Sequence, residues 1–277
     1  MKYTIVVSSL FIILSSCNSI TDKQPQKPTN ELVERFKPFL HGVWIQADYI
    51  DDIAKTKSPF KSSEKLTFIS EMIIDTSNVA TDSMLINIAL GNHEGSDFIL
   101  YFKQGKTPMS LLTGIRGFEL ESDSYELGYE INNYDTTLIL YHYKKNQKLL
   151  DKTKYIRVIE VSHNRSLEDG FQYMVNKKLI TGSYLVTDST DKERLVQMTS
   201  EGVVKGLPGI ETYYVITDFV ASEDSSDVIC FDIQTDTQNC YAFKINGDTI
   251  TLFKAPINET DTLFNAGHAL YKFLKQH

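Results

Sequence analysis

Short alternating segments dominate the chain and constrain its fold more than any other feature. Between residues 65 and 161, apolar and polar residues alternate in runs of six to eleven, separated by turns rich in Asn, Asp, Gly, Ser or Lys. A period of two places one face of a strand in a core and the other in solvent. Because helical runs long enough for βαβ units are missing from this stretch, the pattern predicts an antiparallel all-β barrel or sandwich. The runs are KLTFISEMIID, MLINIAL, DFILYF, SLLTGI, YELGYEI, TTLILYHY and KYIRVIEV.

A second set of alternating segments follows an interruption at residues 162–170. The glycine-rich stretch at 202–209 has no helix after it, so we expect a loop there and no phosphate-binding turn. The strands predicted in this half are SYLVTD, RLVQMT, ETYYVITDF, DVICFDI, CYAFKI, TITLFK and ALYKFL.

The two halves of the chain begin alike. LHGVWIQ at 40–46 and ITGSYLV at 180–186 share the pattern apolar-x-Gly-x-aromatic-apolar, and helical segments at 30–40 and 171–178 precede them. Similar halves of this kind indicate a tandem duplication of one unit.

We therefore expect an all-β fold of two tandem antiparallel barrel units with short helices, at 31–165 and 166–277. The alternative is one larger barrel or sandwich. A further short helix is expected at 49–55, where three apolar residues recur at helical spacing.

The first predicted strand carries Gly42-Val43-Trp44, which resembles the Gly-x-Trp signature of lipocalins and related calycin β-barrels. That family has an Arg near the end of its last strand, stacked across the Trp, and Arg157 stands at this place. The resemblance covers residues 36–160. It implies that Trp44, Arg157 and Gly42 close one end of a lipocalin-like barrel, and a guanidinium over an indole contributes about 0.5–2 kcal/mol.

The second half departs from this pattern. Tyr184 replaces the Trp, and either Lys272 or Phe273 stands where the Arg is expected. The helix expected at 49–55 is similar to those that cover the mouth of fatty-acid-binding barrels. By this resemblance, the first barrel would hold a small ligand beneath that helix.

The N-terminus resembles the export signal of bacterial lipoproteins. Lys2 precedes an apolar run at 5–14, which is too short to span a bilayer because a spanning helix needs roughly 20 residues. The sequence LSSC at 14–17 resembles a lipobox, in which the Cys receives diacylglycerol. The resemblance to lipoproteins of the Bacteroidota type implies that Cys17 is the acylated first residue of the mature protein.

The resemblance to lipoproteins also predicts a location. Residues 1–16 would be a signal peptide, and residues 17–30, which contain no aromatic, would be a flexible tether. We expect the protein in the cell envelope, attached to a membrane by fatty chains such as palmitate, on the periplasmic or the surface face. The alternative is an ordinary signal peptide with a chance Cys17.

The charge balance argues against nucleic acid as a partner. Without residues 1–16, the chain keeps 27 basic and 36 acidic side chains, and no basic stripe is present. An acidic surface repels phosphate backbones.

Two cysteines remain after the lipobox. In VICFDIQTDTQNCYAFKI, Cys230 and Cys240 alternate with apolar residues on two strands joined by a turn. A hairpin would place both on the same side, either directly opposed or one step apart. A disulfide forms only in the first case, because its geometry is strict. The alternative is two free thiols, and neither spacing suggests a metal site.

One polar cluster is a candidate site. His93, Glu94 and Asp97 stand close together in GNHEGSDF and could act as acid and base or bind a metal. The bracketing Asn and Gly residues are also typical of a hairpin tip, which is the alternative interpretation. Motifs for a catalytic nucleophile or a bound nucleotide are missing from the sequence, so we expect no cofactor.

The sequence thus favours a membrane-anchored, non-catalytic protein that binds a small apolar or amphipathic ligand in a β-barrel. One alternative is a pair of filled barrels that serves as an interaction module of an envelope complex. The other is an enzyme that uses the loop at 92–97.

Overall fold

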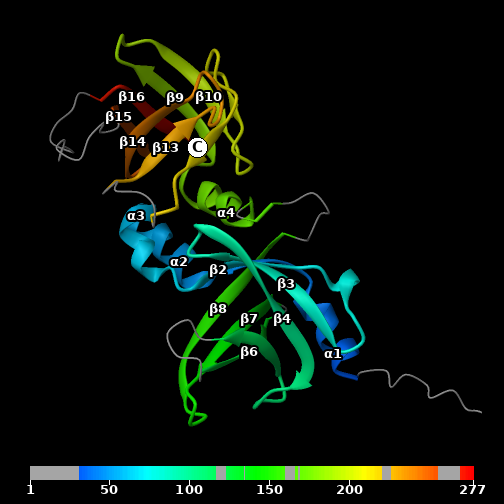
Figure 1. Ribbon diagram of the computed structural model, residues 1–277. Helices are drawn as coiled ribbons and strands as arrows, with labels where there is room; N and C mark the ends of the chain where they lie inside the picture. The colour runs from blue at the N-terminus through cyan, green and yellow to red at the C-terminus, as the bar shows by residue number, and fades with distance from the viewer. Residues whose placement is uncertain are drawn as a thin grey trace, which may run out of the picture.

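The computed structural model contains two antiparallel β-barrels with a layer of helices between them (Figure 1). It describes residues 31–116, 123–133, 135–159, 166–167, 169–219, 226–254 and 269–277. The predicted fold class is confirmed, and the alternative of one larger barrel or sandwich is wrong. The predicted signal peptide and tether, with Cys17, lie outside the described residues. Within the described ranges, no helix is both long and apolar enough to cross a membrane.

Eight strands form the first barrel, and the ladder closes because the last strand pairs with the first. Closure removes the free edges that an open sheet would present to other chains. The elements are α1 (Glu31–Leu40), β1 (Gly42–Gln46), α2 (Ala47–Thr56), α3 (Pro59–Ser62), β2 (Ile69–Ile74), β3 (Ser83–Leu90), β4 (Glu94–Gln104), β5 (Ser110–Arg116), β6 (Ser124–Asn132), β7 (Asp135–Tyr143) and β8 (Leu149–Ile159), with 3-10 turns at Ser63–Lys65 and Thr76–Asn78.

The second barrel repeats this order, since its first strand also pairs with its second and its last. The elements are α4 (Asp169–Leu179), β9 (Gly182–Asp188), β10 (Glu193–Met198), β11 (Val204–Lys205), β12 (Tyr213–Val215), β13 (Val228–Phe231), β14 (Asn239–Asn246), β15 (Thr249–Lys254) and β16 (Tyr271–Gln276).

The second sheet is nearly closed because its two edge strands, β11 and β12, meet at one end. A single bridge joins Val203 to Thr212. Beside it, the Val204 N–H donates to the Glu211 carbonyl at 2.7 Å. The loop expected at 202–209 contains a two-residue strand, β11, which pairs with β10, so the expectation is wrong for Val204 and Lys205.

Large apolar side chains fill the first barrel. They include Trp44, Met72, Leu100 and Leu127, which are completely buried. Helix α1 covers one end, where Phe36 packs edge-on against Tyr129 on β6.

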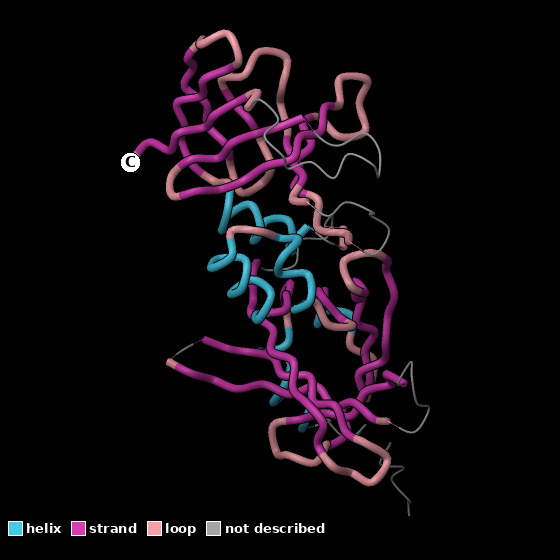
Figure 2. The backbone as a smooth tube through the Cα atoms, turned by 90° about the vertical axis from the view of Figure 1, so that its left-hand side faces the viewer, coloured by secondary structure: helices cyan, strands magenta, loops and turns pink. Residues whose placement is uncertain are grey.

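The core of the second barrel continues through the helices onto the outer wall of the first. Tyr49 of α2 stacks on Phe171 of α4 with ring centroids 5.0 Å apart. Ile45, on the outer face of β1, belongs to the same buried cluster as these rings and as Phe243 inside the second barrel. Figure 1 and Figure 2 show α2, α3 and α4 between the two sets of strands, whereas α1 lies against the first barrel.

Helix α2 therefore lies elsewhere than expected. The expectation that it covers the mouth of the first barrel is wrong, because it packs between β8 of that barrel and α4. Its apolar face, Tyr49, Ile50 and Ile53, joins the core of the second barrel instead.

The predicted stack of Arg157 on Trp44 is confirmed. The two residues are cross-strand partners, and the guanidinium carbon lies 4.6 Å from the indole centroid. The indole N–H donates to the Leu40 carbonyl at 2.7 Å, and Arg157 donates to the Phe39 carbonyl at 3.0 Å. Gly42 has φ 134°, a conformation that side chains disfavour, which explains the Gly of this motif.

The second barrel has an equivalent set of contacts. The Tyr184 hydroxyl donates to the Ile180 carbonyl, again four residues earlier. Lys275 is the cross-strand partner of Tyr184, and its ammonium donates to the Thr181 carbonyl at 3.0 Å. Burial raises the pKa of Tyr184 to about 12.

The expected equivalent of Arg157 in the second half is therefore corrected. Lys272 pairs with Thr187 and Phe273 with Val186, so neither lies opposite Tyr184. The residue that lies opposite Tyr184, as Arg157 lies opposite Trp44, is Lys275, three positions later than Lys272.

Cys230 and Cys240 are direct cross-strand partners on β13 and β14, with Cα atoms 4.0 Å apart. They form a disulfide, so the alternative of two free thiols one step apart is wrong.

We predict that Trp44→Ala lowers the free energy of unfolding by about 3–5 kcal/mol, because it removes a completely buried ring and its hydrogen bond. Arg157→Met, which keeps an apolar stem, should cost about 1–2 kcal/mol. The control is Arg194→Met, which removes only a partly exposed ion pair with a 3.5 Å separation from Asp188. Urea unfolding measures all three, and a Trp44→Ala cost no larger than that of the control would contradict the structural role of Trp44.

Candidate functional site

The predicted polar loop at 92–97 is a hairpin tip that contacts the second barrel. His93 lies in the turn between β3 and β4, and its Nδ1 is 2.8 Å from a carboxylate oxygen of Asp218. Glu94 and Asp97 lie on β4 and are exposed. Across the described part of the chain, no group of three His, Cys, Asp or Glu side chains could hold a metal ion.

A buried amide beside this turn connects the barrels further, because the Asn92 side chain donates to the Thr217 hydroxyl. Within the second barrel, the Gln172 side chain on α4 holds the same segment by donating to the Val215 carbonyl at 2.6 Å. All of these groups are buried, where a hydrogen bond lost without replacement is costly. The two barrels are thus held together by polar as well as apolar contacts.

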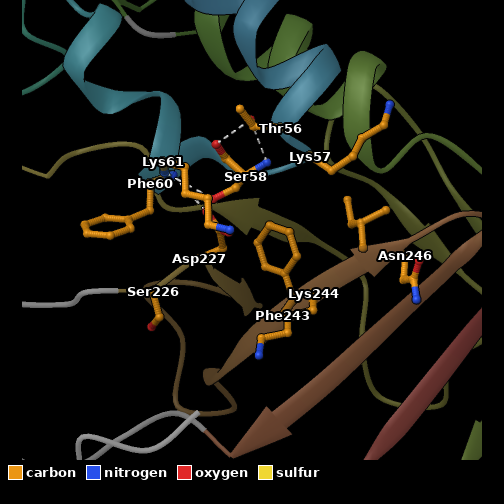
Figure 3. A pocket seen from close by; sticks show the side chains of 11 residues that line it. Thr56, Lys57, Ser58, Phe60, Lys61, Ser226, Asp227, Phe243, Lys244 and Asn246 are labelled. Atoms are coloured by element: carbon orange, nitrogen blue, oxygen red, sulfur yellow. Dashed lines mark hydrogen bonds between the residues drawn. The ribbon is translucent and has the colours of Figure 1, made fainter.

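A pocket lies at this junction, between the α2–α3 corner and the second barrel (Figure 3). Its volume is about 390 Å³, within the range of small-molecule sites. The first barrel contributes Thr56, Lys57, Ser58, Phe60 and Lys61, and the second contributes Ser226, Asp227, Phe243, Lys244, Ile245 and Asn246.

Local sequence explains the shape of the α2–α3 corner. Lys57 ends α2 in the left-handed conformation with φ 56°, and its N–H donates to the Ile53 carbonyl. Ser58 caps α3 by accepting from the Lys61 N–H at 3.1 Å, and Pro59 follows at the first helical position, which suits its fixed φ. The T-K-S-P sequence therefore stops one helix and starts another at the pocket.

Asp227 joins the two sides of the pocket. Its carboxylate accepts from the Phe60 backbone N–H at 2.8 Å, a contact between residues 167 positions apart. Burial raises the pKa of Asp227, while hydrogen bonds from Ser58 and Phe60 and the nearby charge of Lys61 offset part of this effect. These hydrogen bonds to the Asp227 carboxylate therefore stabilise the position of the α2–α3 corner against the second barrel.

The rest of the pocket combines apolar walls with polar groups. Phe243 points into the space between the corner and the barrel, and Ile245 follows it on β14 (Figure 3). Ser226 is 4% exposed, and its hydroxyl has no hydrogen-bond partner within the described residues. Such an arrangement suits a molecule with an apolar body and a polar group.

The barrel interior offers less room. In the second barrel, a gap bounded by Met198, Phe231, Leu252 and Phe273 admits no water molecule. The first barrel is filled by its own large side chains. The junction pocket is therefore the better candidate site.

One apolar patch lies on the outer face of the second barrel. Leu185 on β9 is the cross-strand partner of both Leu195 and Leu274, which are 72% and 48% exposed. Three leucines thus form a row across β10, β9 and β16.

Sequence reasoning missed the residues of the junction pocket. The helix-stop and cap signals around Lys57 and Ser58 were present, but nothing local marks Asp227 as their partner. No protein-family model matches the chain, and no curated protein is similar enough in sequence to indicate kinship.

We predict that two substitutions of Asp227 change the free energy of unfolding in different ways. Asp227→Ala leaves the Phe60 N–H without its acceptor and should cost about 1–3 kcal/mol at pH 7. Asp227→Asn keeps a side-chain oxygen that can accept from the Phe60 N–H, and it removes the buried negative charge. An acid whose folded pKa is raised stabilises the fold at low pH, and this contribution is lost as pH rises from about 4 through the folded pKa.

The stability of Asp227→Asn relative to the native protein should therefore increase between pH 4 and pH 7 in urea unfolding. A relative decrease over this interval would contradict the assigned cause of the pKa shift.

Proposed function

We propose that the protein is an exported, lipid-anchored binding protein that holds a small amphipathic molecule in the junction pocket. The observation that carries this proposal is the pocket of about 390 Å³, with apolar and polar walls contributed by both barrels. We assign no catalysis to the 92–97 loop, because His93, Glu94 and Asp97 are exposed and do not line the junction pocket.

The ligand would lie at the junction and not in the interior of the first barrel. The lipocalin-like resemblance of Gly42, Trp44 and Arg157 concerns how the first barrel is closed, and these residues lie in or beside a filled core. Binding at the junction would stabilise the contact between the barrels, because each of them contributes one wall.

The lipid anchor fits this geometry. Acylated Cys17 would stand 14 residues before Glu31, and a tether of that length reaches at most about 50 Å. Helix α1, where the tether begins, lies on the side of the first barrel away from the second (Figure 1). The anchor would therefore leave the pocket open to solvent.

A role as an interaction module is the second candidate function. The filled barrels and the exposed row formed by Leu195, Leu185 and Leu274 favour it, because exposed apolar patches often mark protein contacts. If the pocket binds nothing, this row becomes the better candidate surface.

The pocket is tested by filling it. We predict that N-phenylnaphthylamine binds the delipidated protein at one site, and that Asn246→Trp weakens binding about tenfold or more because the indole occupies the pocket. Gln276→Trp places the same ring on an exposed position of β16 and is the matched control. Fluorescence titration measures both, and equal binding by the two variants would contradict a site at the junction.

The anchor is tested by Cys17→Ala. We predict that the native protein fractionates with membranes, whereas the variant is recovered in the soluble fraction, because two or more acyl chains are needed for stable attachment. Mass spectrometry of the native protein should show diacylglycerol on Cys17. An unmodified Cys17 in a soluble native protein would contradict this part of the proposal.

A further inference from the structure

We infer that the junction pocket selects an organic anion, with a carboxylate, sulfonate or phosphate group on an apolar body. This inference rests on the proposed function and adds the charge of the ligand.

The charges of the lining residues favour an anion. Three lysines, Lys57, Lys61 and Lys244, line the pocket, against the single acid Asp227. This local excess of positive charge stands out in a chain whose net charge is −8. Asp248, the next acid along the β14–β15 hairpin, is not among the residues that line the pocket.

Asp227 does not make the pocket a cation site. Its Oδ1 already accepts from the Phe60 N–H at 2.8 Å, and Ser58 also donates to this carboxylate. Lys61 lies on the same side of the pocket (Figure 3). A cationic ligand would have to displace these donors and approach the lysines.

The remaining walls fit the two parts of such a ligand. Ile245 is partly exposed and offers apolar surface for the body of the ligand beside the buried ring of Phe243, and the exposed Lys57 and Lys61 line the pocket from the α2–α3 corner. Ser226 has a buried hydroxyl with no hydrogen-bond partner in the described part of the chain, which is an exception in folded proteins. An anionic oxygen that accepts from this hydroxyl would satisfy it.

Two dyes that differ only in charge test the inference. Anilinonaphthalene sulfonate and N-phenylnaphthylamine share one aromatic skeleton, and only the first carries a sulfonate. We expect the sulfonate to bind about tenfold more tightly at low ionic strength, with this advantage shrinking as salt screens the lysines.

Two variants and a matched control locate the effect. Lys57→Gln and Lys61→Gln should each weaken binding of the sulfonate about fivefold and leave N-phenylnaphthylamine unchanged. Gln is tolerated at the backbone angles of Lys57, since Gln147 and Gln234 adopt a similar positive φ. Lys55→Gln, two residues earlier on the same helix and outside the pocket, should change neither affinity. Unchanged melting temperatures confirm that each variant is folded.

The outcomes separate the two proposals. If both dyes bind with equal affinity, and neither Lys57→Gln nor Lys61→Gln weakens binding of the sulfonate, the anion inference is overturned. The pocket would then remain a binding site. The same holds if Lys55→Gln weakens the sulfonate as much as Lys57→Gln does. If Asn246→Trp changes the affinity for neither dye, the proposed function itself is contradicted.

Discussion

A contact between the end of a helix and the first strand that follows it organises each barrel. The last carbonyls of a helix have no partners within it. In the first barrel, Trp44 and Arg157 donate to two such carbonyls at the end of α1. In the second barrel, Tyr184 and Lys275 donate to the carbonyls of the two residues directly after α4, Ile180 and Thr181. Because one donor stands on the first strand and the other on the last, the contact joins the strands that close each barrel.

This constraint also fixes the helices that separate the barrels. Helix α4 leads into the second barrel as α1 leads into the first, so it must lie at the second barrel's end. There it also covers the outer wall of the first barrel, where its Phe171 N–H donates to the buried carboxylate of Glu71 at 2.8 Å. A single helix thus completes one barrel and attaches it to the other.

The junction pocket arises where the two repeats differ. In the first, α2 and α3 are inserted between the first two strands, whereas in the second a short turn at 189–192 joins β9 to β10. The inserted corner reaches across to the second barrel, and Asp227 accepts from its backbone. A symmetric pair of barrels would lack this corner, and with it the wall that carries Lys57 and Lys61.

Local sequence patterns predicted most of the strands, the helices α1, α2 and α4, and the stack of Arg157 on Trp44, because these depend on neighbouring residues or on a familiar signature. They did not predict α3, and the strand expected at 211–219 is limited to Tyr213–Val215. They did not predict β11, whose two residues owe their extended form to pairing with β10. Nor did they place α2, since its apolar face fits a core contributed mainly by the other barrel. The pocket could not be predicted from local sequence either, because Phe60 and Asp227 come together only through the packing of distant segments.

The central claim is that one continuous core joins the two barrels through the helices. Differential scanning calorimetry of the delipidated protein tests it most directly. The account predicts a single transition whose calorimetric and van't Hoff enthalpies agree. Two resolved transitions, one for each barrel, would contradict it.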